Sequence, residues 1–277
     1  MTQTTDRDME RTQLETLLFA RTYLYTMFHK LFGGEPSSEL LNMLQDDVTA
    51  DCIDEYAQDS AQMAGFASFI AGLRSQDQAA LFDAAKDEYT RVFIGPAALP
   101  ASPYEAPYTG HHEMAVFQEN TIKVRRLYKE HGLQAKRLQR VPDDHVSLLC
   151  AFQALQARAA LDAFYAGNWT EATELLREQG AFAKEHLANW LGVYAKAVRN
   201  SKAGRMAVLY PQLIEAADAF VQLDVTLAWE AAYWAEQGSA DACPFEPCEV
   251  LKPASEALDL LEAQRLVGLE DNELVSI

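Results

Sequence analysis

Residues 88–110 read EYTRVFIGPAALPASPYEAPYTG, and they divide a strongly helical sequence into two parts. Apolar residues recur at helical spacing as far as Phe93, and Gly95 and Pro96 then end the pattern. Three more prolines follow at positions 100, 103 and 107, among aliphatic and tyrosine side chains. Long loops in compact domains are usually functional or disordered, and the apolar content argues against disorder. We therefore expect a stiff, extended loop that flanks a peptide groove rather than a flexible linker.

Helical periodicity also dominates the sequence outside this loop. We expect helices over residues 14–32, 37–45, 48–73, 78–93, 111–131, 142–166, 170–199, 211–235 and 254–267, with a break near Gly180 and a capping box at Ser75 and Gln78. We find no convincing strand pattern and no repeat. The predicted fold class is all-α: a single bundle of about eight or nine helices over residues 1–236, followed by a C-terminal extension over residues 237–277 that holds a short helix.

The net charge and the cysteines limit the partners and the cellular compartment that we expect for this protein. The chain has 277 residues and a net charge of −18, from 23 Lys and Arg against 41 Asp and Glu. This charge disfavours nucleic acid and anionic membranes as partners and favours a basic ligand or peptide, although an acidic surface also serves solubility alone. The N-terminus shows no apolar signal region, and the longest apolar run, Ser60–Leu73, is too short to span a bilayer. Four scattered cysteines, at positions 52, 150, 243 and 248, indicate no disulfide framework and a reduced, cytoplasmic protein.

Few residues in the sequence suggest catalysis or metal binding. The sequence has no phosphate-binding loop, no dinucleotide fingerprint and no serine-hydrolase elbow. His111, His112 and Glu113 could bind a metal, together with Asp144 and His145, in a helical metalloenzyme; they could equally begin a helix at the surface. Asp144 and His145 could likewise cap a helix, or face outward as an acceptor for a guanidinium or amide group.

Three segments of the sequence occur in a recognisable order. They are Glu88-Tyr89-x-Arg91-Val92-Phe93-Ile94-Gly95-Pro96 followed by Ser102-Pro103-Tyr104-Glu105, then Pro142-x-Asp144-His145, then Phe182-Ala-Lys-Glu-His186-Leu187-Ala-Asn-Trp190. Together they resemble the TorD/DmsD/NarJ superfamily of redox-enzyme maturation chaperones. Val141 replaces the acidic residue that is usual in the family before this proline.

The resemblance implies a TorD-like, all-helical cytoplasmic chaperone that is not an enzyme and carries no cofactor. Its partner would be a molybdopterin-dependent oxidoreductase catalytic subunit, often bound by its twin-arginine leader until cofactor insertion, folding and export proofreading are complete. The oligomeric state stays open, with a homo-oligomer among the alternatives. The matching peptide-site residues are Phe93, Gly95, Pro96, Pro103 and Tyr104 on the loop side, and Pro142, Asp144 and His145 at the polar end. His186 and Trp190 share one helical face and are expected to point into the core.

Overall fold

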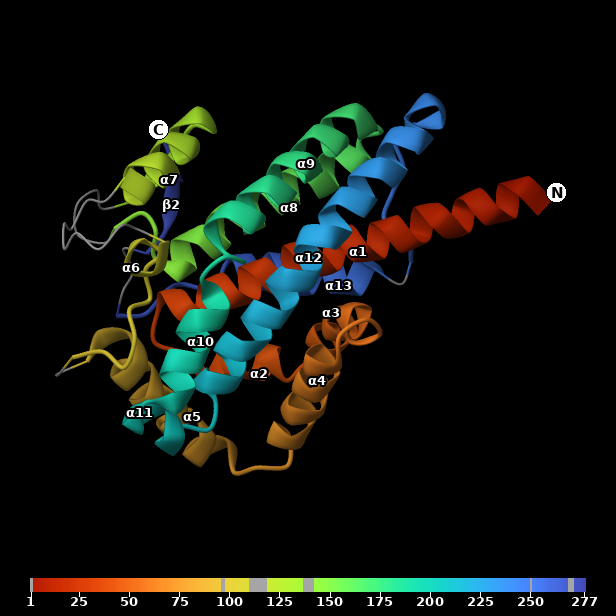
Figure 1. The fold of residues 1–277 in the computed structure, drawn as a ribbon. Coiled ribbons are helices and arrows are strands. Elements are labelled where there is room, and N and C mark those ends of the chain that lie inside the picture. The colour runs from red at the N-terminus through yellow and green to blue at the C-terminus, as the bar shows by residue number, and fades with distance from the viewer. Residues whose placement is uncertain (1, 96–97, 110–118, 137–141, 250, 269–271) are drawn as a thin grey trace.

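The computed structural model describes residues 2–95, 98–109, 119–136, 142–249, 251–268 and 272–277 (Figure 1). The α-helices are α1 (Thr2–Gly33), α2 (Ser38–Leu44), α3 (Asp47–Ala57), α4 (Ala61–Leu73), α5 (Gln78–Tyr89), α6 (Ala106–Thr109), α7 (Glu119–Glu130), α8 (Val146–Tyr165), α9 (Trp169–His186), α10 (Leu191–Asn200), α11 (Lys202–Met206), α12 (Tyr210–Gly238) and α13 (Leu251–Glu262). A π-helical turn, Thr90–Ile94, extends α5, and a 3-10 turn, Ser239–Asp241, follows α12. The strands are β1 (Leu133–Ala135) and β2 (Leu274–Ser276).

Four long helices form the centre of the bundle. α1 runs through the molecule, α8 and α12 pack against it, and α9 packs against both α8 and α12 (Figure 1). α8 is rich in Ala and Leu and is buried on almost all sides, which makes it the central helix of the core. The all-α prediction is therefore confirmed. The described residues contain thirteen α-helices rather than eight or nine, because several predicted segments are interrupted and short helical turns occupy the connections.

A buried polar network joins three of the long helices, α1, α9 and α12, to the shorter helix α3. Asp224 on α12 accepts hydrogen bonds from the hydroxyls of Tyr25, at 2.8 Å, and Tyr56, at 2.6 Å. The guanidinium of Arg21 lies 3.2 Å from the same carboxylate and donates to Oε1 of Gln179 on α9. An isolated charge in a core is strongly destabilising, so this carboxylate and guanidinium depend on each other and on the two hydroxyls. The network fixes α1, α3, α9 and α12 in one relative arrangement.

Two expected helix boundaries lie elsewhere in the structure. The predicted 48–73 helix is interrupted before Ser60, whose hydroxyl accepts from the N–H of Met63 and so begins α4. The predicted break at Gly180 is wrong, since α9 continues to His186. A Cβ at position 180 would lie 2.8 Å from Nε1 of Trp229, so the glycine permits close helix packing instead.

The helix after residue 77 also begins differently from the prediction. Asp77, and not Ser75, is its N-cap residue, because the Asp77 carboxylate accepts from the backbone N–H groups of Ala79 and Ala80.

The C-terminal residues lie against the bundle. α13 packs on α1, and Lys30 donates from Nζ to the carbonyl of Gln264. β2 pairs with β1 in an antiparallel ladder that the sequence did not predict, since three-residue strands are too short to show alternation. The division into residues 1–236 and 237–277 stays a prediction. No helix in the described part of the chain is long and apolar enough to cross a membrane.

Candidate functional site

The helix before the loop ends as its sequence predicts. The π-helical turn stops at Gly95, whose φ of 60° lies in the left-handed region that favours glycine and whose N–H donates to the carbonyl of Thr90. Phe93 is buried, with its ring 5.7 Å from that of Phe32 and 5.6 Å from that of Tyr210. Pro96 lies outside the described residues. The start of the loop is thus attached to the core by an aromatic side chain.

A buried glutamate holds this helix end against the last long helix. Both carboxylate oxygens of Glu88 accept backbone N–H groups, from Val208 at 2.6 Å and from Leu209 and Tyr210 at 2.9 and 3.0 Å. A carboxylate at a helix N-terminus satisfies otherwise unpaired donors and interacts favourably with the helix dipole. Glu88 therefore fixes the base of the loop to the N-terminus of α12.

The structure brings the loop and the start of α8 together. The N–H of Glu105 donates to the carbonyl of Asp144 at 3.1 Å, and the N–H of Val146 donates to the carbonyl of Pro103 at 2.9 Å. The rings of Tyr104 and His145 meet edge to face, with centroids 5.1 Å apart. We call this junction of residues 103–106 with residues 144–146 the clasp.

The Asp144 side chain strengthens the clasp from inside. Its Oδ2 accepts from the N–H of Ala106 at 2.9 Å, and its Oδ1 accepts from the hydroxyl of Thr121 on α7 at 3.0 Å. Burial raises the pKa of Asp144, because water no longer solvates the ionised carboxylate, while the two donors act in the opposite direction. One carboxylate therefore links the loop, α7 and the start of α8.

Of the two alternatives for Asp144 and His145, a helix cap or an outward-facing acceptor, the structure excludes the outward-facing acceptor. Asp144 is 0% exposed and His145 2% exposed, because both side chains lie beneath the loop. His145 is the N-cap of α8, and its Nδ1 accepts from the N–H of Ser147 at 3.2 Å. Burial lowers the pKa of His145 to about 3, so its imidazole is neutral at physiological pH. Pro142 is half-buried at the edge of the same turn. The assignment of these residues to a peptide site stays a prediction.

A second link joins the loop to α9. Oε2 of the buried Glu105 lies 3.0 Å from Nδ1 of His186, and the ring of Tyr108 stacks on Trp190 with centroids 5.3 Å apart. His186 and Trp190 are both buried, so the prediction that they point into the core is confirmed. Glu105 belongs to the first resembling segment, but the sequence alone assigns it no role. Its partner is 81 residues away, and no local spacing could have revealed the pair.

The described part of the structure gives no support to the alternative that the protein is a helical metalloenzyme. His111, His112 and Glu113 lie outside the described residues, and the described residues contain no group of three or more His, Cys, Asp or Glu side chains that could hold a metal ion. Cys52 and Cys150 are free and buried.

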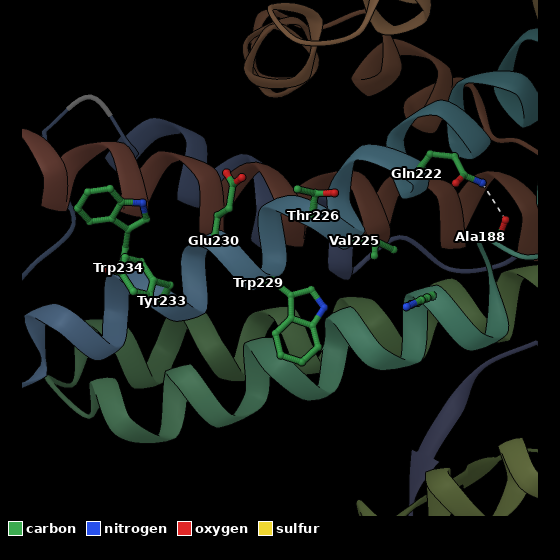
Figure 2. Close-up of a pocket in the computed structure, with 9 residues that line it drawn as sticks. Ala188, Gln222, Val225, Thr226, Trp229, Glu230, Tyr233 and Trp234 are labelled. Atoms are coloured by element: carbon green, nitrogen blue, oxygen red, sulfur yellow. Dashed lines mark hydrogen bonds between the residues drawn. The ribbon is translucent and has the colours of Figure 1, made fainter.

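An open hollow of about 580 Å³ lies between α9 and α12 (Figure 2). Trp229 extends over α9, while Tyr233 and Trp234 lie one turn further along α12. These three aromatic side chains are about half exposed, at 46%, 57% and 51%. Contiguous exposed aromatic groups are typical of surfaces that bind a partner. This groove is thus a second surface to be considered beside the clasp.

Comparison with known proteins places all three sequence segments in one family. The model of the nitrate reductase delta subunit family matches residues 52–196, just over half of the chain, and this range contains every residue of the clasp. Relatives named Tat proofreading chaperone DmsD, from Salmonella typhi, Salmonella paratyphi A and Salmonella typhimurium, are each 33% identical to the chain over 66 residues. Each match covers 24% of this chain and 32% of the relative, so the similarity spans about a third of the relatives' length. The predicted family membership is confirmed, and the chain belongs to the nitrate reductase delta subunit family of NarJ/TorD-like chaperones.

Proposed function

We propose that this protein is a non-catalytic cytoplasmic chaperone that binds the precursor of a molybdopterin-dependent oxidoreductase by its twin-arginine signal peptide. It would hold that precursor until cofactor insertion and folding are complete. The observation that carries the proposal is the family match, together with relatives that are named Tat proofreading chaperones.

The physical character of the chain supports a peptide of this kind. A signal peptide has a basic first region followed by an apolar stretch. The net charge of −18 attracts the basic region over long range, and apolar contacts then slow release. A binding protein also needs surface and rigidity rather than a nucleophile, and the clasped loop offers both.

Within this proposal the predicted site residues divide by burial. Phe93, Pro103, Asp144 and His145 are buried and would act by holding the loop in shape. Tyr104 is half-buried at the surface of the clasp and would contact the peptide directly. A loop that is fixed before binding loses less conformational entropy when the peptide arrives, which raises affinity.

The test is a calorimetric titration of the full-length chain with synthetic twin-arginine leaders from candidate oxidoreductases. Saturable binding to at least one leader is expected, and a scrambled leader of the same composition serves as the control. If neither a leader nor a mature oxidoreductase subunit binds, the proposed function is wrong.

A further inference from the structure

A pocket of about 250 Å³ opens between α7, α8 and α9 and shares His186 with the second link of the loop. Its lining includes four rings, those of His131, Phe152, Phe182 and His186. The ring centroids lie 4.7 Å apart for Phe152 and Phe182, 4.9 Å for Phe182 and His186, and 5.2 Å for His131 and Phe152. Each ring contacts the next, and together the four rings form one continuous aromatic wall of the pocket.

The mouth of the pocket is acidic. Glu130, Glu178 and Glu185 belong to its lining and are all more than half exposed. Glu130 already forms a 2.9 Å ion pair within α7. Glu178 lies 3.6 Å from Nε2 of His131, and Glu185 lies 4.0 Å from Nε2 of His186, distances too long for hydrogen bonds. Glu178 and Glu185 therefore keep most of their capacity to accept from a bound cation.

We propose that this pocket binds the guanidinium group of an arginine in the client's signal peptide. The inference rests on the proposed function and adds the place where the basic region of the peptide is recognised. A planar guanidinium is the cation best suited to the site, because it stacks on aromatic faces and donates paired hydrogen bonds to carboxylates.

The size of the pocket agrees with this occupant. Pockets for drug-sized ligands measure about 300–1,000 Å³, so a pocket of about 250 Å³ suits one side chain better than a whole small molecule. Its position also agrees, since His186 lines the pocket and contacts Glu105 of the loop. A peptide that lies along the loop could place a basic side chain here.

The first experiment tests the pocket without a leader. N-acetylarginine amide is added to the full-length chain, and the imidazole NMR signals of His131 and His186 are followed; N-acetylcitrulline amide is the uncharged control. The arginine compound should shift both signals and the citrulline compound should not. The double variant Glu178→Gln/Glu185→Gln should lose the shift, whereas Glu256→Gln, which alters an exposed glutamate on α13, should keep it. Equal responses to the two compounds would overturn the proposal.

The second experiment uses a leader that binds the wild-type chain. The double variant should bind it about tenfold or more weakly, the loss expected for a charge-assisted hydrogen bond, while Glu256→Gln should bind it normally. A leader with its arginines replaced by glutamine should bind wild type and double variant equally. If the leader binds the double variant as tightly as the control, the pocket inference fails and the proposed function stands. If no leader binds the wild type, the proposed function fails, and the arginine compound alone decides the pocket.

Discussion

Replacement of Asp144 by alanine tests whether one buried carboxylate holds the loop in place. The variant leaves the N–H of Ala106 and the hydroxyl of Thr121 without their acceptor. Each unsatisfied buried donor costs about 1–3 kcal/mol. Part of this cost is offset, because the variant also removes a carboxylate whose ionised form burial disfavours, as its raised pKa indicates. We therefore expect the free energy of unfolding to fall by about 2 kcal/mol, or Tm by roughly 4–8 °C.

The assay for this prediction has a global and a local part. Urea unfolding followed by circular dichroism gives the change in stability, and Asp83→Ala, at an exposed position on α5, is the matched control. Hydrogen exchange at residues 103–109 gives the local opening of the clasp, which should speed up about tenfold or more, since 1.4 kcal/mol corresponds to a factor of ten. If the Asp144→Ala protein keeps its stability and its exchange rates in this segment, the Asp144 carboxylate does not hold the loop in place.

Two further predictions concern buried charge and pH. Asp224→Ala leaves the guanidinium of Arg21 without its counter-ion in the core, so we expect a loss of about 3–5 kcal/mol in urea unfolding; a loss below about 1 kcal/mol would contradict the network. Burial lowers the pKa of His29 and of His145 to about 3, against 6.5 for an ordinary histidine. Below pH 6.5 the unfolded chain therefore binds protons that the folded chain does not, and stability falls toward pH 3 by up to about 1.4 kcal/mol per pH unit for each histidine. In denaturant titrations between pH 7 and pH 4, His145→Gln should flatten this slope, and an unchanged slope would show that His145 is not buried as a neutral group.

The sequence predicted the helices better than the contacts between them. The end of the helix at Gly95 follows from local spacing, and the structure agrees. His186 and Trp190 are buried as predicted, but they do not share one helix, because α9 ends at His186 and Trp190 is the N-cap of α10. The break at Gly180 was wrong, because a glycine inside a helix can serve close packing instead of a stop. What decides between the two is Trp229, which lies on another helix and is invisible to local pattern.

Local sequence patterns also could not predict the contacts that form the candidate site. The prediction that the loop and the start of α8 work together came from a family resemblance, not from periodicity, and the structure shows that the two segments are in contact. The burial of Asp144 could not be predicted, since its partners Ala106 and Thr121 are 38 and 23 residues away in the chain. From the sequence alone, an aspartate at the start of a helix is interpreted as an exposed cap or acceptor. Only the structure shows the loop that covers Asp144. The acidic pocket was missed for the same reason, because its rings and carboxylates come from three helices.

Hydrogen exchange of the full-length chain with and without a bound twin-arginine leader shows where the leader binds. We expect slower exchange at residues 98–109 and 178–186 when the leader is present, and unchanged exchange in α3 and α4. Protection confined to residues 225–234, in the aromatic groove of α12, would contradict binding at the clasp and the pocket, because the leader would then bind away from both.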